Sequence, residues 1–258
     1  MKNPIIDLKR YRNFLETISL DKYRSELKNI KWIEQDLPKK ILPLTSIYQH
    51  YWENREYLQF ENWFEKFWEE INTDEESKGV LENFKKYYFN KSLEENDWFK
   101  KGFKARMYRT WISVLTQLDF CYMFEYICAK KNISLKLECN AELDARGIDA
   151  KVNNICLQIA KISQRKEARP AKRKNIIPIP YMVLDIEEYK RKINSKRVRN
   201  QSVYQKTLEV FLKYFDILKN GFVVFKENYV EKIIDNIHNE QKLMQEINEI
   251  LKELSGKS

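Results

Sequence analysis

Histidine, glycine and proline are scarce in this chain of 258 residues. Only two histidines, His50 and His238, are present. A histidine-based metal site or a Ser-His-Asp triad therefore has little support, because both depend on imidazole. Five glycines and six prolines are few for a fold built from tight turns, which disfavours an all-β sandwich or a turn-rich repeat.

Long apolar runs are also missing. No stretch approaches 18 uninterrupted apolar residues, so no transmembrane helix is expected. The opening MKNPIIDLKRYRNF lacks the apolar region of a secretory signal peptide. The few cysteines form no Cys-x-x-Cys pair, and their apolar neighbours favour reduced core thiols over disulfides or zinc ligands. They are Cys121, Cys128, Cys139 and Cys156. We expect a cytoplasmic protein without a membrane partner.

Charged and apolar residues, by contrast, are abundant. Lys and Arg total 47 against 38 Asp and Glu, which gives a formal net charge of +9, and 43% of residues are hydrophobic. That apolar content is sufficient for a packed core and excludes a disordered tail protein. A basic chain is expected to meet an acidic partner if its positive charge is concentrated in one place.

The positive charge is concentrated in residues 161–206, called here the basic segment. It holds 14 Lys and Arg against 4 Asp and Glu, a net charge of +10, so the other 212 residues carry −1. Residues 163–175 lack an apolar period and are predicted to form a loop. In 192–206, Ser, Asn and Gln alternate with basic residues, which suits contact with base edges as well as phosphates.

We therefore expect double-stranded DNA as the partner of the basic segment. The candidate DNA-binding residues are Arg165, Lys166, Arg169, Arg173, Lys196, Arg197 and Arg199. A solvated basic face is the alternative. A membrane surface fits less well, because the segment has no broad apolar face with bulky aromatic anchors.

Two kinds of hydrophobic pattern divide the chain. Residues 5–130 read as mostly helical, with apolar residues three and four apart, and Ala105–Lys131 is the longest such stretch. After Leu135, short β-rich runs follow at 135–139, 148–152, 155–163 and 177–186. After Ser195 the helical pattern returns and is predicted to continue to the C-terminus.

Residues 141–163 carry the pattern most typical of catalysis. Asn153-Asn154 predicts a hairpin turn, because Asn tolerates positive φ. Asp149 would begin one strand of this hairpin, and Gln158 and Lys161 would lie on the other. Carboxylate, amide and carbonyl oxygens suit Mg²⁺, and a nearby lysine can orient a water or neutralise charge on a phosphorane. Further carboxylates near this region are Glu125, Glu142 and Asp144, each of which can equally be an ordinary helix or loop residue.

These residues resemble the PD-(D/E)XK nuclease superfamily. Gly147-Ile148-Asp149 stands in the "PD" position, and Leu157–Lys161 stands near the "(D/E)XK" position in the variant that begins with Gln. The resemblance implies that Asp149, Gln158 and the backbone carbonyl of Ile159 bind Mg²⁺ and that a lysine assists the water. Asp144 and Glu125 are weaker candidates for a second carboxylate ligand.

Position 160 departs from the superfamily pattern. The pattern needs a lysine two residues after Gln158, but Ala160 stands there and Lys161 is expected to face the other side of a regular strand. Three interpretations are open. A β-bulge turns Lys161 inward, Ala160 replaces a catalytic lysine and inactivates the chain, or the site is degenerate.

Further stretches resemble the TaqI type of type II restriction endonuclease. They are WIEQDLP (32–38), PLTSIYQHYW (43–52), ELDARGIDAKV and LQIAKISQRKEAR. The resemblance implies a Mg²⁺-dependent homodimer that cuts duplex DNA at the palindrome TCGA, since a two-fold dimer places one active site on each strand.

The resulting fold prediction is α/β (α+β). A small mixed sheet with flanking helices would form the nuclease core, with helical N- and C-terminal regions. Residues 1–104 are predicted to pack as a helical region on a catalytic core of 105–258, or to be continuous with it. The alternatives are a non-catalytic DNA-binding protein with a decayed nuclease fold, and a helical protein that binds an acidic protein.

Overall fold

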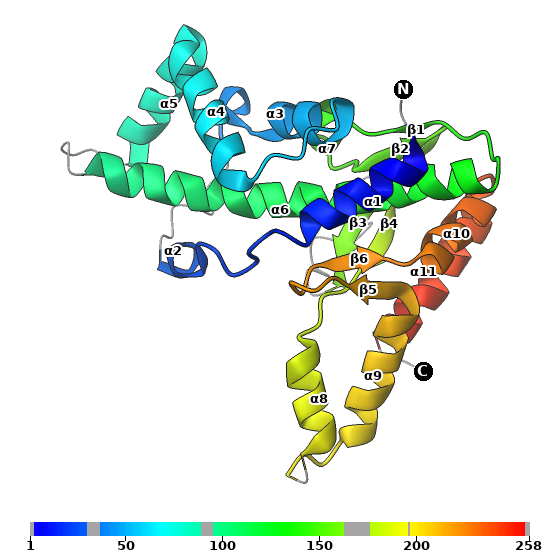
Figure 1. The fold of residues 1–258 in the computed structure, drawn as a ribbon. Coiled ribbons are helices and arrows are strands. Elements are labelled where there is room, and N and C mark those ends of the chain that lie inside the picture. Colours follow the sequence, from blue (N-terminus) through cyan, green and yellow to red (C-terminus); the bar gives the residue numbers. More distant parts are fainter. Residues whose placement is uncertain (1–2, 30–36, 89–94, 163–175, 196, 256–258) are drawn as a thin grey trace. The chain divides into compact units, whose positions relative to one another are not determined.

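The computed structural model describes residues 3–29, 37–88, 95–162, 176–195 and 197–255 (Figure 1). It divides into two compact units. Unit 1 comprises Met1–Glu16 and Asp119–Ser258, and unit 2 comprises Thr17–Leu118. Among the described residues, no helix combines the length and the apolar character needed to cross a membrane.

Unit 2 is helical, as its sequence pattern predicted. Its elements are α2 (Arg24–Asn29), η2 (Lys39–Ile41), α3 (Leu44–Tyr48), η3 (Gln49–Glu53), α4 (Phe60–Thr73), α5 (Glu75–Tyr88) and the part of α6 (Glu95–Lys130) up to Leu118. Aromatic rings fill its interior. Phe60 of α4 packs edge-on against Tyr108 of α6, with 4.8 Å between ring centroids, and Trp63 stacks on Phe67. Large buried rings of this kind contribute most of the apolar area of such a core.

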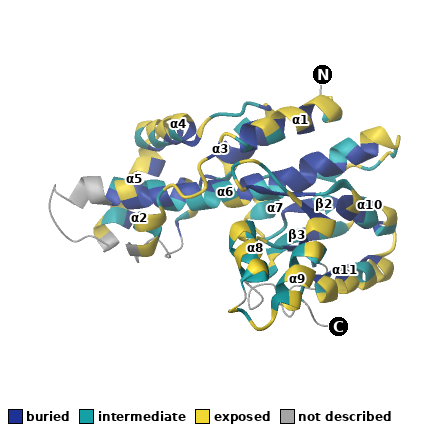
Figure 2. Cartoon of the chain, turned by 60° about the horizontal axis from the view of Figure 1, so that its bottom comes forward, coloured by how far each residue is buried: buried dark blue, intermediate teal, exposed yellow. Residues whose placement is uncertain are grey.

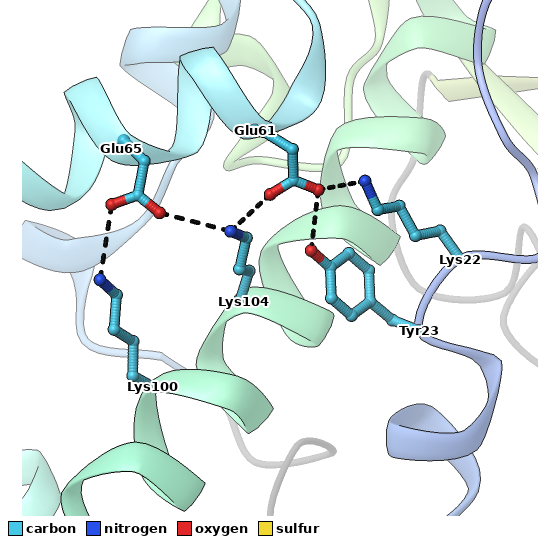
Figure 3. A network of polar contacts seen from close by, with 6 residues as sticks. All are labelled: Lys22, Tyr23, Glu61, Glu65, Lys100 and Lys104. Carbon is cyan, nitrogen blue, oxygen red and sulfur yellow. Dashed lines mark hydrogen bonds and ion pairs between the residues drawn. The ribbon is translucent and has the colours of Figure 1, made fainter.

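A network of charged groups joins α4 to α6 at the surface of unit 2 (Figure 3). Glu61 accepts a hydrogen bond from the Tyr23 hydroxyl at 2.9 Å and pairs with Lys22 and Lys104. Lys104 also lies 3.3 Å from Glu65. Burial acts against the charge of Glu61, but its hydrogen bonds together lower its pKa. The charges of this network therefore have a structural role in joining α4 to α6.

Unit 1 contains the four-stranded mixed sheet that the sequence predicted. Its strands are β1 (Leu137–Glu138), β2 (Ala150–Val152), β3 (Ile155–Lys161) and β4 (Ile176–Tyr181), in the order β1-β2-β3-β4. The first three are antiparallel neighbours, and β4 runs parallel to β3. Asn153 has φ of 53° in the turn between β2 and β3, which confirms the predicted hairpin.

Helices flank this sheet, so the predicted small mixed α/β core is confirmed. They are α1 (Pro4–Leu15), the second part of α6, α7 (Ala141–Asp144), α8 (Ile186–Asn194), α9 (Gln201–Tyr214), α10 (Glu227–Asn236) and α11 (Glu240–Leu254). Tyr11 of α1 stacks on Tyr122 of α6 with ring centroids 4.2 Å apart. On the β4 side, the Tyr229 hydroxyl of α10 donates a hydrogen bond to the Pro180 carbonyl at 2.7 Å.

Two predictions for the C-terminal third were wrong. The run 177–186 leaves the sheet at Tyr181, and α8 begins at Ile186, because the Asp185 side chain caps the backbone N–H of Glu188. The helical pattern after Ser195 is also interrupted, by a hairpin of β5 (Phe215–Ile217) and β6 (Val223–Phe225). Asn220-Gly221 supplies its turn, with Gly221 at φ of 91°.

The predicted domain boundary near residue 104 stays a prediction. The structure groups α1 with the C-terminal segments, and the change from unit 2 to unit 1 falls inside α6, between Leu118 and Asp119. A continuous helical pattern contains no signal for such a boundary, because the helix passes through it without a break.

Candidate active site

Asp149 is held at the entrance to the β2–β3 hairpin by short-range backbone contacts. Asn140 caps α7 by accepting a hydrogen bond from the Leu143 N–H at 3.0 Å, and Gly147 takes φ of 76° in the turn that follows. This left-handed conformation suits glycine, which has no Cβ. The Asp149 N–H then donates to the Leu157 carbonyl at 2.9 Å. The chain therefore enters β2 with Asp149 already fixed against β3.

The side chain of Asp149 contacts the backbone of β3. Its Oδ2 accepts a hydrogen bond from the Ile159 N–H at 2.6 Å, so the carboxyl group lies against the peptide bond between Gln158 and Ile159. In a ladder, the N–H and C=O of one residue point toward the same neighbouring strand. The Ile159 carbonyl therefore faces the Asp149 side as well.

Burial dominates the electrostatics of Asp149. The residue is only 3% exposed, and burial together with the nearby negative charge of Asp144 raises its pKa to about 8, against the opposing hydrogen bond from Ile159. The structure thus brings two of the predicted carboxylates together. A buried carboxyl beside a second carboxylate is a common arrangement at functional sites.

The oxygen groups at this point fit a hard divalent cation. The Asp149 carboxyl accepts from the Ile159 N–H, the Ile159 carbonyl points toward the same neighbouring strand, and Gln158, the residue before Ile159 in β3, carries an amide oxygen. Mg²⁺ prefers such oxygen ligands, and a cation here would reverse the two effects that disfavour ionised Asp149. Among the described residues, no three side chains of Asp, Glu, His or Cys are close enough to hold a metal. The fit therefore depends on amide and carbonyl oxygens.

Glu125 and Asp149 both lie close to Cys121. Burial and a hydrogen bond with Cys139 raise the pKa of Cys121 on α6, and the charges of Asp149 and Glu125 both add to this shift. The two carboxylates therefore share a buried thiol as neighbour. Glu142, on α7, is exposed.

The four cysteines form no disulfide in the structure. All four are free thiols, and Cys156 is the one that is only half-buried. The other three are buried in unit 1, Cys121 and Cys128 on α6 and Cys139 just after β1. These thiols pack as small apolar side chains around the sheet.

The register of β3 decides how Lys161 is oriented. Residues 156–161 pair one-to-one with 176–181 of β4, so this stretch of β3 contains no bulge. Gln158 and Ala160 therefore share one face, and Lys161 is exposed on the other. The interpretation in which a bulge in β3 turns Lys161 inward is not supported. The pairing is irregular at the other side of β3, at the start of β2. There Asp149 and Ala150 both lie opposite Leu157, as in a β-bulge.

Part of the predicted DNA-binding set falls on described residues. Arg197 and Arg199 are exposed in the turn between α8 and α9. Arg165, Lys166, Arg169, Arg173 and Lys196 lie outside the described residues. The two helices pack against each other and extend away from β5 and β6 (Figure 1). We call residues 186–214 the α8–α9 hairpin.

The α8–α9 hairpin is an exposed element. No residue of α8 is buried, and the buried residues of α9 are Phe211 and Tyr214, at its C-terminal end (Figure 2). Tyr189 and Tyr204 pack edge-on at 5.5 Å, and the Lys192 amine lies 5.0 Å from the centre of the Tyr204 ring. These contacts join the helices to each other and leave their tip in solvent.

Lys151 is a candidate site residue that the sequence analysis did not name. It pairs with Cys156 across the hairpin, so it lies on the face of the sheet that carries Gln158 and Ala160. The signal was its place two residues after Asp149, which becomes meaningful only when the pairing register of β2 and β3 is known.

Comparison with known proteins gives consistent matches over most of the chain. The model of the TaqI restriction endonuclease family matches residues 8–237. The chain is 34% identical over 241 residues to the type II restriction enzyme TaqI of Thermus aquaticus, covering 88% of this chain and 86% of that protein. It is 32% identical, with the same coverage, to the type II restriction enzyme TthHB8I of Thermus thermophilus. No solved structure matches.

Proposed function

Because the chain belongs to the TaqI restriction endonuclease family, we propose that it hydrolyses phosphodiester bonds of duplex DNA at a short palindrome, TCGA, with Mg²⁺. The observation that carries this proposal is the Asp149 carboxyl, buried beside Asp144 and bonded to the backbone of β3. Such a group costs stability in the folded protein, and natural chains retain that cost where function requires it.

Each site residue has a distinct role in this proposal. Asp149, the Gln158 amide and the Ile159 carbonyl would hold Mg²⁺, with Asp144 and Glu125 as weaker candidates for an additional carboxylate. When bound, Mg²⁺ acts as a Lewis acid and lowers the pKa of a coordinated water. A cationic side chain is also required beside the scissile phosphate. The resemblance assigns this role to Lys161 or to a lysine at position 160.

DNA would be bound by the basic segment. Its candidates remain Arg165, Lys166, Arg169, Arg173, Lys196, Arg197 and Arg199. Of these candidates, Arg197 and Arg199 are described by the structure. Both are exposed, and neither is within ion-pair distance of a described carboxylate, which supports the assignment. Exposed guanidinium groups are suited to phosphate contacts.

We also propose that the enzyme acts as a homodimer in the cytoplasm. A two-fold site is read by two copies of one chain, and each copy would cut one strand. The free thiols of all four cysteines are in keeping with a reducing compartment.

Incubation with two matched duplexes tests the proposed activity. One duplex contains a single TCGA site, and the other has the same composition with that site scrambled. The expected result is two discrete fragments from the first duplex only, with Mg²⁺ and not with EDTA. Smearing of both duplexes would contradict the sequence specificity, and tight binding with no cleavage would contradict the enzymatic assignment.

Ala160 favours a second candidate function, a DNA-binding protein with a decayed nuclease site. The superfamily pattern needs a lysine at this position, and the regular register of β3 leaves Lys161 on the opposite face. This candidate predicts steeply salt-dependent DNA binding without cleavage, in the Ala160→Lys variant as well.

Replacing both Arg197 and Arg199 with alanine is expected to weaken DNA binding at every salt concentration. If each arginine contacts a phosphate, the slope of log K against log salt concentration becomes shallower by about 2. Fluorescence anisotropy with a labelled duplex measures it. The matched control removes two exposed lysines of α11, in the Lys242→Ala/Lys252→Ala variant. An equal change in both variants would show a general charge effect and contradict direct contact.

A further inference from the structure

Because position 160 is alanine, the Gln158 face of the hairpin lacks the lysine of the superfamily pattern. Another lysine lies on that face. Register places Lys151 there, because Lys151 pairs with Cys156, and Cys156, Gln158 and Ala160 alternate along one face of β3. Gln158 is the diagonal neighbour of Lys151. Diagonal positions in an antiparallel pair are within reach of long side chains.

The contacts of Lys151 leave its amine available. It is half-buried, and within the described part of the chain its amine lies in no ion pair. Its neighbour across β1 is Glu138, which already has a closer cation, since Lys136 donates to Glu138 at 2.9 Å. The hydrogen bond and the charge of Lys136 are the main causes that lower the pKa of Glu138, and Lys151 adds less.

We propose that Lys151 supplies the active-site cation that position 160 lacks, and that it contacts the scissile phosphate from the Gln158 face of the hairpin. This inference rests on the proposed function. In the hydrolysis, a water oxygen forms a bond to phosphorus while the bond from phosphorus to the leaving sugar oxygen breaks. The water loses a proton to solvent, and the leaving oxygen takes one up. The Lys151 ammonium group stabilises the negative charge that grows on the phosphate oxygens.

Lys151 is also in a different strand from the lysine of the pattern. It lies in β2, and Asp149 precedes that strand, two positions before Lys151 in the sequence. The hairpin brings β2 and β3 together around one site, so a cation from either strand can serve the same phosphate. Lys161 lies on the face of β3 opposite Gln158, so it is not the lysine that shares the Gln158 face.

A cycle of variants tests this assignment. Lys151→Gln is made in the natural Ala160 chain and in the Ala160→Lys variant. Cleavage of the TCGA duplex with Mg²⁺ is measured, together with duplex affinity in EDTA. In the Ala160 chain, Lys151→Gln is expected to lower the cleavage rate by about 10²–10³-fold, the usual cost of losing one group that stabilises transition-state charge. In the Ala160→Lys variant the same change is expected to cost less than about tenfold, because the new lysine replaces the lost charge.

Three controls separate catalysis from structure. Lys151→Arg keeps the charge and is expected to retain most of the activity. Lys136→Gln removes the other lysine beside Glu138 and is expected to leave cleavage unchanged. Duplex affinity in EDTA is expected to change by less than about tenfold in Lys151→Gln, since one contact among many is lost.

Several results would overturn the role of Lys151. An equal loss of cleavage in both backgrounds indicates a structural effect. No loss in the Ala160 chain shows that Lys151 is not used. A natural chain that is inert until Ala160→Lys restores cleavage also refutes Lys151, while the proposed function stands. If neither chain cleaves, the proposed function and the inference both fail.

Discussion

Replacing Asp149 with asparagine is expected to reduce Mg²⁺-dependent DNA cleavage by roughly 10³-fold or more. The asparagine amide oxygen can still accept the hydrogen bond from the Ile159 N–H, but it brings no negative charge to the cation. Metal assistance contributes several kcal/mol to transition-state stabilisation, and each 1.36 kcal/mol is a factor of ten in rate.

The same substitution is expected to stabilise the fold when no divalent cation is present. The pKa of Asp149 is raised to about 8 by burial and by Asp144, whereas an unfolded Asp has a pKa near 3.9. Between these values the folded chain binds a proton that the unfolded chain lacks, so stability falls as pH rises from about 4 to about 8. Asparagine does not ionise, so its advantage over Asp149 grows across this range.

Thermal unfolding in EDTA at pH 5 and pH 8 measures this effect. The melting temperature of Asp149→Asn is expected to exceed that of the natural chain by several degrees more at pH 8 than at pH 5, since 1 kcal/mol corresponds to roughly 2–4 °C at this chain length. Mg²⁺ is expected to stabilise the natural chain and not the variant. Glu249→Gln, on the exposed side of α11, is the control for loss of one negative charge. A pH-independent difference would contradict the buried-carboxyl explanation.

Replacing Asp119 with alanine is expected to be strongly destabilising. Asp119 is fully buried and accepts hydrogen bonds from the Arg12 guanidinium at 2.9 and 3.2 Å and from the Phe225 N–H at 2.8 Å. Arg12 also donates to the Phe225 carbonyl at 2.6 Å. One carboxylate therefore joins α1, α6 and β6.

The expected cost of Asp119→Ala is about 3–5 kcal/mol, because the variant leaves a largely buried guanidinium and a buried N–H without their acceptor. Urea denaturation followed by circular dichroism measures it. Glu187→Gln is the control. It removes an exposed ion pair with Lys190, 3.1 Å long, and is expected to cost less than about 0.5 kcal/mol. A similar small loss for Asp119→Ala would show that the buried network does not stabilise the fold.

Local signals in the sequence predicted the elements around the active site. Asn153-Asn154 predicted the β2–β3 hairpin because Asn adopts positive φ at low cost, and the structure has this conformation at Asn153. The long apolar period of 105–131 predicted the main helix, although α6 begins earlier, at Glu95. These features depend on residues near one another in the chain, which a single sequence contains directly.

Features that depend on distant residues were missed. The β5–β6 hairpin interrupts a pattern that reads as helical, and it is held by contacts from β4, where the Tyr181 hydroxyl donates to the Val223 carbonyl at 3.0 Å. The pairing of Arg12 with Asp119 joins residues 107 positions apart. No periodicity within one segment indicates such partners, because they are chosen by packing between elements.

The sequence by itself determined the family, the concentration of positive charge in residues 161–206, and the position of Asp149 at the start of a hairpin. Only the tertiary structure decided what surrounds Asp149 and which lysine shares the Gln158 face. The regular pairing of β3 with β4 directs Lys161 away from that face, and the pairing of β2 with β3 brings Lys151 onto it. The physical reason is that side chains alternate along a strand, so register assigns each residue to a face, and register is set by partners far away in the chain.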